Sequence, residues 1–264
     1  MSAYLIIIRN AVAESASYRL NQIVSFLTIS LPLVFAVFLW KTVFNQVDEI
    51  TNFDLPSTLT YYLLVVLLQD ILYSGVKWEI VDDIHSGGLT KWLTKPISYL
   101  WMQVSVRIGT NIPYFLVAFI LGSVFVFLNL NRLVWTTEPI RWLMFLAAII
   151  MAFFLAFFLS FGFSLVAFWT QDTSGIEFAI SIFLPLLSGQ ILPITFFPKE
   201  FQAILVYLPW RYTLDFPIQV YLGTLSSVQI GTGFTVEFLW LVALYFIAKT
   251  LWKNGLNIYQ AVGG

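Results

Sequence analysis

Several residue types that common chemistries require are missing or scarce in this chain. Its 264 residues include no cysteine and one histidine, His85. Without cysteine, disulfides, thiolate metal sites and thiol nucleophiles are excluded. His85 has only Asp82 and Asp83 beside it in the sequence, which is too small a donor set for a metal ion. The motifs G-x-x-x-x-G-K-[ST], G-x-S-x-G and H-E-x-x-H are also absent. We therefore predict no catalytic residue, no metal site, no cofactor bound by this chain and no enzyme activity of its own.

Charged residues are scarce as well. They make up 10% of the chain, against about 25% in a soluble domain, while 59% of the residues are apolar. The mean hydropathy is +0.87. These values predict an integral membrane protein in the lipid bilayer. The net charge of -1 shows no basic surface for nucleic acid. The length leaves room for several membrane spans in one domain, 1–264, and none for a separate soluble domain.

The apolar residues form six stretches that predict an all-α, multi-pass fold. A helix needs about 20 apolar residues to cross the bilayer. The predicted transmembrane spans are 23–44, 59–76, 101–128, 140–169, 178–195 and 234–252. We expect the third to be broken near Asn111 and Pro113, because proline removes a helix hydrogen bond. The second span contains Asp70, which either has a structural partner or reaches toward the membrane surface.

The segment that precedes the first span, 1–21, has an amphipathic pattern. Its apolar face is formed by Tyr4, Ile8, Ala11, Val12 and Ser15, and its charged residues lie away from that face. This pattern predicts a helix that rests in the membrane interface. A solvated leader is the alternative.

The most polar segment, 77–98, lies between the second and third spans. Ile80, Val81 and Ile84 share one face at helical spacing, and Gly87 and Gly88 suit a helix C-terminus. Short amphipathic helices in such a loop predict a site where another protein docks. A solvated loop on the membrane surface is the alternative.

Prolines interrupt the apolar sequence after the fifth span. They stand at 193, 198, 209 and 217, so a single continuous helix is impossible there. Because the sequence between them stays apolar, we predict short re-entrant helices over 198–223, held where protein or a water-filled cavity surrounds the irregular backbone. We expect the transport path or its outer gate in this region.

The distribution of basic residues predicts the orientation. Eight Lys and Arg residues lie on the side of the termini and five on the other. Cytoplasmic segments carry the excess of basic residues, so both termini and the 77–98 loop are predicted to be cytoplasmic and the re-entrant helices outward. The two sets are Arg9, Arg19, Lys77, Lys91, Lys95, Arg107, Lys249 and Lys253 against Lys41, Arg132, Arg141, Lys199 and Arg211.

Several motifs, in this order, resemble the permease subunits of ABC-2-type exporters. The loop sequence IHSGGLTKWLTKPIS (84–98) is similar to the family pattern I-x-x-G-x-L-x-x-x-L-x-x-P-[IL]. The fifth span ends in S-G-x-x-x-P, here 188–193, and F-P and L-P-W elements follow at 197–198 and 208–210. The ending GLNIYQAVGG (255–264) resembles that of one subfamily.

This resemblance implies a permease in the plasma membrane of a prokaryote. Two ATPase subunits, which hold ATP and Mg, would bind below a pair of permeases, and the second permease would be identical or different. ATP binding would rock the pair between inward- and outward-facing states. A coupling helix over 79–85 would fit a groove on the ATPase. Its coupling residues would be Glu79, Ile80, Asp82, Asp83, Ile84 and His85.

Within that interpretation, residues of the fifth span and its neighbours are candidates for a pathway. Ser188 and Gln190 would offer polar contacts beside Phe183, Leu187 and Phe197, although helix packing explains each equally well. Four aromatic residues would form either an outer gate or an interfacial aromatic belt. They are Phe201, Tyr207, Trp210 and Tyr212.

The apolar, aromatic lining favours a hydrophobic or amphipathic substrate. Two other functions stay open at this point. One is a membrane scaffold or immunity protein that moves nothing. The other is an ion-coupled secondary carrier built around Asp70.

Overall fold

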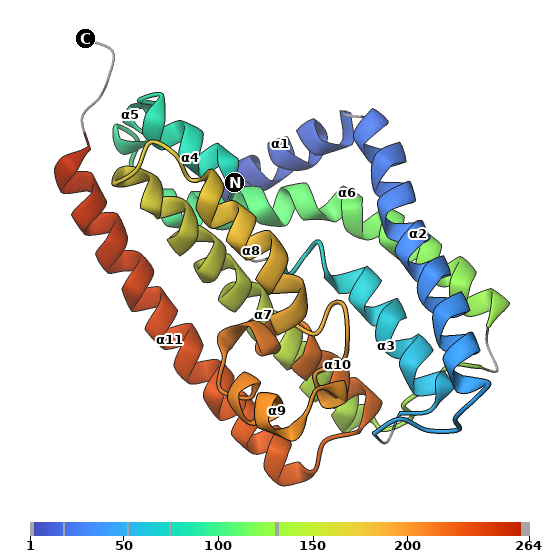
Figure 1. Cartoon of the computed structure of the whole chain (residues 1–264). Coiled ribbons are helices and arrows are strands. Elements are labelled where there is room, and N and C mark those ends of the chain that lie inside the picture. The colour runs from blue at the N-terminus through green and yellow to red at the C-terminus, as the bar shows by residue number, and fades with distance from the viewer. Residues whose placement is uncertain are drawn as a thin grey trace.

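A computed structural model describes residues 3–17, 19–51, 53–73, 75, 77–129 and 132–259. The regular elements of this described part are helices, which confirms the all-α prediction (Figure 1). The end of the predicted second span, Val76, and the last residues of the C-terminal motif, 260–264, lie outside it. The larger helices are α1 (Ala3–Ser17), α2 (Arg19–Phe44), α3 (Leu55–Leu68), α4 (Trp78–His85), α6 (Tyr99–Leu128), α7 (Pro139–Leu165), α8 (Ser174–Leu187) and α11 (Ser227–Ile258).

Three helices in the described residues are long and apolar enough to cross a membrane. They are Tyr99–Leu128, Pro139–Phe168, which adds the 3-10 turn η2 (Val166–Phe168) to α7, and Ser227–Ile258. Three shorter apolar helices accompany them, over Ser30–Phe44, Leu55–Leu68 and Ser174–Leu187. A helix of 14 residues, such as α3 or α8, spans only about 21 Å of a hydrocarbon core that is about 30 Å thick.

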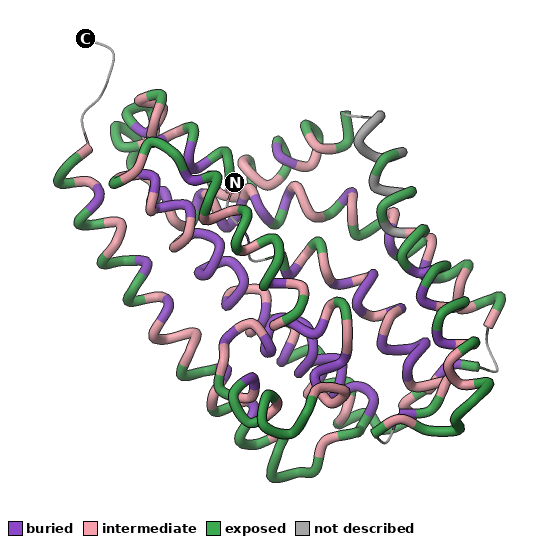
Figure 2. The backbone as a smooth tube through the Cα atoms, in the orientation of Figure 1, coloured by how far each residue is buried: buried purple, intermediate pink, exposed green. Residues whose placement is uncertain are grey.

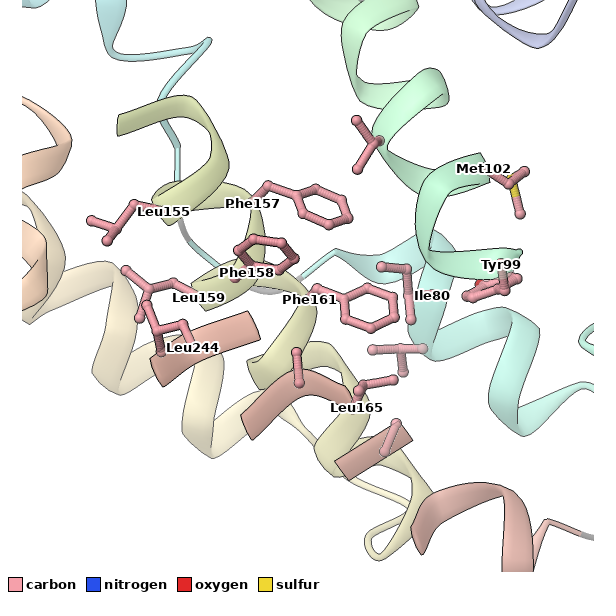
Figure 3. Close-up of a cluster of buried hydrophobic side chains, with 14 of the residues drawn as sticks. Ile80, Tyr99, Met102, Leu155, Phe157, Phe158, Leu159, Phe161, Leu165 and Leu244 are labelled. Carbon is pink, nitrogen blue, oxygen red and sulfur yellow. The ribbon is translucent and has the colours of Figure 1, made fainter. Parts of the chain in front are cut away.

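The core of the protein is built around α7. Helix α11 packs along one side of it, and η4 (Pro209–Thr213) and α10 (Asp215–Leu222) pack against another. Figure 2 shows the buried backbone concentrated in α7 and α10, while α2, α8 and α11 keep long exposed stretches. The buried side chains include Leu155, Phe157, Phe158 and Phe161, which lie together with Leu244 of α11 (Figure 3). The exposed apolar faces of the outer helices suit a lipid environment or a partner subunit.

Helix α1 lies against the first half of α6. A Cβ on Gly109 would come within 2.6 Å of the Ala11 Cβ and of the Ile8 carbonyl oxygen, so the two helices touch there. Ala11 is buried, and the Ser15 hydroxyl donates to the Thr110 carbonyl at 3.3 Å. The predicted helix is therefore present, and its predicted apolar face packs against α6.

Two predicted helix ends and one predicted helix break were wrong. The second apolar helix ends at Leu68, eight residues before the predicted end at 76, and the fifth ends at Leu187 instead of 195. The break expected near Asn111 and Pro113 is not present, because α6 is one helix from Tyr99 to Leu128.

Side-chain hydrogen bonds explain the early end of α3. After Leu68 only some amides continue the helical pattern, such as that of Leu72, which donates to the Leu68 carbonyl at 2.9 Å, and several carbonyl groups accept from side chains of other helices. Arg107 donates to the carbonyl groups of Ile71 and Tyr73, and Ser160 donates to that of Gly75 at 2.5 Å. Because these carbonyl groups accept hydrogen bonds from side chains, the irregular backbone is tolerated inside a membrane protein.

The proline-rich stretch forms four short elements, as its prolines require. They are η3 (Ile194–Phe196), α9 (Lys199–Leu205), η4 and α10. The residues of η4 and α10 are almost completely buried against α7 and α3. The short helix α5 (Thr90–Leu93) follows the predicted docking helix. Gly223, whose backbone is in the left-handed conformation, ends α10.

Candidate transport pathway and docking site

A buried carboxylate holds the broken segment together. Asp215, at the start of α10, is 0% exposed. Its Oδ1 accepts from the Tyr61 hydroxyl (3.2 Å) and the Ile194 amide (3.1 Å). Its Oδ2 accepts from Arg211 Nε (3.2 Å) and Gln219 Nε2 (2.6 Å). Four donors, one of them the Arg211 guanidinium, compensate the desolvation of the charge, so the network fixes α3, η3, η4 and α10 relative to one another.

The same network fixes the end of α8. The Asp215 amide donates to the Ser188 carbonyl (3.0 Å), and the Tyr61 hydroxyl lies 2.7 Å from the Gly189 carbonyl. Gly189 has a φ of 82°, and a Cβ there would come within 2.5 Å of the Tyr61 hydroxyl. Only glycine fits this left-handed, crowded position. The S-G pair therefore ends the helix at a fixed point.

A cavity of about 660 Å³ lies between α2, α3 and α8. Its size is in the range of small-molecule sites. The lining is mainly apolar and aromatic, with Gln69, Asp70 and Gln190 as polar members; Gln190 Nε2 donates to Gln69 Oε1 at 2.8 Å. The apolar lining includes Pro32, Phe35, Trp40, Tyr62, Val66, Leu184 and Ile191.

A second cavity, of about 410 Å³, adjoins the first. The two share Thr28, Asp70 and Tyr73 as lining residues. The lining of the second is polar and includes Glu14, Lys77, Glu79, Thr110 and Asn111. The pair thus runs from a polar chamber beside α4 to an apolar chamber beside the end of α8.

Helix α4 lies where the docking helix was predicted. Ile80 and Ile84 are buried against the core around α7, together with Val81, and hold the helix in place. Glu79 and Asp82 are exposed on the other side. The predicted apolar face is thus directed into the protein, and the surface left for a partner is acidic.

Asp83 and His85 have internal hydrogen bonds. Asp83 Oδ2 accepts from the Tyr99 hydroxyl at 2.8 Å. His85 Nε2 lies 3.1 Å from the Ala167 carbonyl oxygen and 3.0 Å from that of Thr170, so Nε2 carries the hydrogen. Both residues tie α4 to the spans above it.

Trp78, at the start of α4, links this helix to α8. Its Nε1 donates to Glu177 Oε1 in the first turn of α8 at 2.8 Å. Beside it, the Lys77 amide donates to the Ser164 hydroxyl of α7 at 2.7 Å. A displacement of α4 would therefore pull on α7 and α8 together.

The five residues predicted for the pathway separate in the structure. Gln190 lines the larger cavity. Ser188 is buried, and its hydroxyl has no hydrogen-bond partner among the described residues. Phe183 is exposed on another side of α8, while Leu187 and Phe197 are half-buried and are not among the cavity-lining residues.

The four aromatic residues predicted for the gate do not form one cluster. Phe201 and Tyr207 are exposed. Trp210 is half-buried, and Tyr212 is buried with its ring 5.3 Å from that of Phe216. Tyr207 and Tyr212 line a separate cavity of about 660 Å³ between η4, α10 and α11.

Sequence reasoning missed the residues that organise the site. Arg211 and Asp215 stand four positions apart in a stretch that is otherwise apolar, which is the sequence signal of a buried ion pair. Tyr61 and Trp78 carried no such signal, because aromatic residues are common throughout the chain.

Comparison with known proteins gave one family. A family model described as ABC-2 family transporter protein matches residues 30–263, nearly the whole chain. A search of curated proteins found no match.

Proposed function

The chain belongs to the ABC-2 transporter family, and on this premise we propose that it is the permease subunit of an ATP-driven exporter. A permease of this family is the transmembrane component, and the nucleotide-binding subunits are separate proteins. ATP and Mg would be bound by those partners. In this proposal α2, α3 and α8 cross the membrane with the three longer helices, both termini are cytoplasmic, and the membrane is the plasma membrane of a prokaryote.

The observation that carries the proposal is the position of α4. Glu79 and Asp82 of this helix are exposed, while its aliphatic residues are buried and its other polar side chains are hydrogen-bonded within the protein. It therefore has a free face for an ATPase and rigid connections to α7 and α8. We infer that ATPase closure moves α4, and that Trp78 and Glu177 pass the movement to the helix that lines the cavity.

The proposed path runs through the two adjoining cavities. Asp215 and Gly189 hold the outward end of α8, so a shift at its inner end would tilt the helix and change the cavity. The apolar and aromatic lining suits a hydrophobic or amphipathic substrate.

A second permease would cover the cavity. Phe35 of α2 lines the cavity and is exposed. Phe38 of α2 and Ile182 and Phe183 of α8 are exposed, apolar and close in sequence to lining residues. Such faces favour a partner helix over water. We propose a pair of permeases, identical or different, that meet along α2 and α8.

The cysteine-free sequence makes a direct test of docking possible. Asp82→Cys places a single thiol on the exposed face of α4, and Glu200→Cys places one on exposed α9 as the matched control. With a short thiol-to-amine cross-linker in native membranes, Asp82→Cys should join an ATPase of the cassette type and Glu200→Cys should not. Equal cross-linking from both positions, or none from Asp82→Cys, contradicts the docking proposal.

A further inference from the structure

A buried guanidinium without a charge partner lies near the start of α6. Arg107 is 5% exposed, and within the described part of the chain neither its Nε nor its Nη1 has a hydrogen-bond partner. Its Nη2 donates to the carbonyl groups of Ile71, at 3.0 Å, and Tyr73. The Phe153 ring lies 5.5 Å from the guanidinium carbon. A charge in such surroundings needs acceptors for its remaining donors.

Arg107 lines a small cavity. Its volume is about 40 Å³, room for a few atoms beyond the side chains. Lys77, Glu79 and Thr110 line both this cavity and the polar chamber of about 410 Å³. The small cavity is thus a side recess of the proposed path, with Arg107 at its wall.

The charges in this recess are mainly positive. Lys77 and Arg107 face it, and the pKa of Lys77 is lowered to about 8, chiefly by burial and next by the positive charge of Arg107. Glu79 also lines it but is exposed, and it forms no ion pair with either cation in the described structure. Asp70 and Glu14 line the polar chamber of about 410 Å³ and are not among the residues that line the recess. Two cations and one acid leave an excess of one positive charge.

We propose that this recess binds a phosphate-type group, the head of an anionic amphiphile whose apolar part occupies the chamber between α2, α3 and α8. A phosphodiester carries one negative charge and offers acceptor oxygens to the free Nε and Nη1 of Arg107 and to the Lys77 ammonium. The two chambers lie on either side of Thr28, Asp70 and Tyr73, which line both, so a head group in one is next to a tail in the other. The inference rests on the proposed function where it treats this amphiphile as cargo; the binding site itself does not depend on transport.

The test measures binding to the whole protein, purified in neutral detergent with any partners that remain bound and without nucleotide. The probes are dioctanoyl phosphatidylglycerol, dioctanoylglycerol, which has the same tails and no phosphate, and inorganic phosphate. Affinity is read from the concentration dependence of the melting temperature. We expect the phosphatidylglycerol to bind at least about tenfold more tightly than dioctanoylglycerol, since charge-assisted hydrogen bonds are lost with the head.

Variants assign the site. Lys77→Gln and Arg107→Gln should each weaken phosphatidylglycerol binding by about tenfold or more, and Lys91→Gln, on exposed α5, should leave it unchanged. Arg107→Lys keeps the charge but loses the planar fork, so it should bind with intermediate affinity if Arg107→Gln does not fold. Glu79→Gln should tighten binding, because it removes the only carboxylate lining the described recess.

Each outcome decides the proposal. If inorganic phosphate binds as tightly as the lipid and is equally sensitive to Lys77→Gln, the phosphate site is supported. Its ligand is then free phosphate and not a lipid head group. Phosphatidylglycerol and dioctanoylglycerol that bind alike, or wild-type affinity in Lys77→Gln and Arg107→Lys, overturn it. A Glu79→Gln variant that melts at a much lower temperature and binds no phosphate probe also overturns it, because Glu79 is then the partner of Arg107. A failed cross-link from α4 would leave this binding result standing.

Discussion

At the scale of single residues, the stability of the pathway region depends on one buried carboxylate. Asp215→Asn removes the charge that compensates Arg211 and leaves a buried cation with a weaker acceptor. Losing one partner of a buried ion pair costs about 3–5 kcal/mol. Tyr61→Phe, the matched control, removes one hydroxyl from the same network and should cost about 1–2 kcal/mol. Thermal unfolding in detergent compares the two, and an Asp215→Asn variant as stable as the wild type contradicts this assignment.

Lys77 gives the protein a specific pH dependence. Its pKa of about 8, against the ordinary 10.5, results from burial first and Arg107 second. Between these two pH values the unfolded chain holds more protons than the folded one, so stability rises with pH. The melting temperature of the wild type should therefore rise relative to that of Lys77→Gln as the pH increases from about 8 to about 10. A difference that stays constant over this range contradicts the lowered pKa.

Asp70 separates the exporter from an ion-coupled carrier. It lines both chambers and its side chain is exposed. Its charge therefore does not compensate that of a buried partner. We expect Asp70→Asn to keep most ATP-dependent transport in reconstituted vesicles, within about threefold of the wild type, because a solvated charge contributes little. Transport that disappears in this variant and also proceeds without nucleotide would instead favour the carrier.

At the scale of secondary-structure elements, the end of α8 is set by Gly189. Its φ of 82° and its closeness to Tyr61 leave no space for a Cβ. Gly189→Ala should destabilise the protein by about 1–3 kcal/mol. Gly175→Ala, where a Cβ meets nothing within 4 Å, is the matched control and should change stability by less than about 0.5 kcal/mol. Equal melting temperatures for the two variants would show that the turn is not constrained.

The connection between α4 and α8 should affect coupling more than assembly. Trp78→Phe keeps an aromatic ring and removes the bond from Nε1 to Glu177. We expect the ATPase to remain bound and the amount of substrate moved per ATP to fall about threefold or more, roughly the loss of one charge-assisted hydrogen bond. Trp101→Phe, at an exposed position of α6, serves as the control. An unchanged ratio in Trp78→Phe would mean that α4 moves α8 by another route.

Elements with strong sequence signals were predicted well, and those set by distant contacts were not. In the described part of the chain, the predicted apolar stretches coincide with the three helices that are long enough to cross a membrane and with the three shorter apolar helices, and the prolines located the short elements after Leu187. The end of α3 at Leu68 depends on Arg107, 39 positions away, so no local pattern reports it. Pro113 does not break α6, because a helix whose other groups remain bonded can continue through a proline.

At the scale of the whole molecule, the sequence could predict the family and the presence of an amphipathic helix, α4, between the second and third apolar helices. It could not predict which residues meet. Gln190 was identified as a polar contact and lies in the cavity, whereas Phe183, with equal apolar character, faces away from it. Arg211 is a local partner of Asp215, but Tyr61 of α3 and the Ile194 amide of η3 meet this carboxylate only in the fold.

The most direct test of this account is gentle purification of the protein from its native membrane, with mass spectrometry of what accompanies it. We expect an ATPase of the cassette type, with or without a second permease, and its loss from an Asp82→Lys variant that keeps the wild-type melting temperature. A protein that purifies alone, folded, and moves substrate into vesicles without nucleotide would contradict the central claim that it is the permease of an ATP-driven exporter.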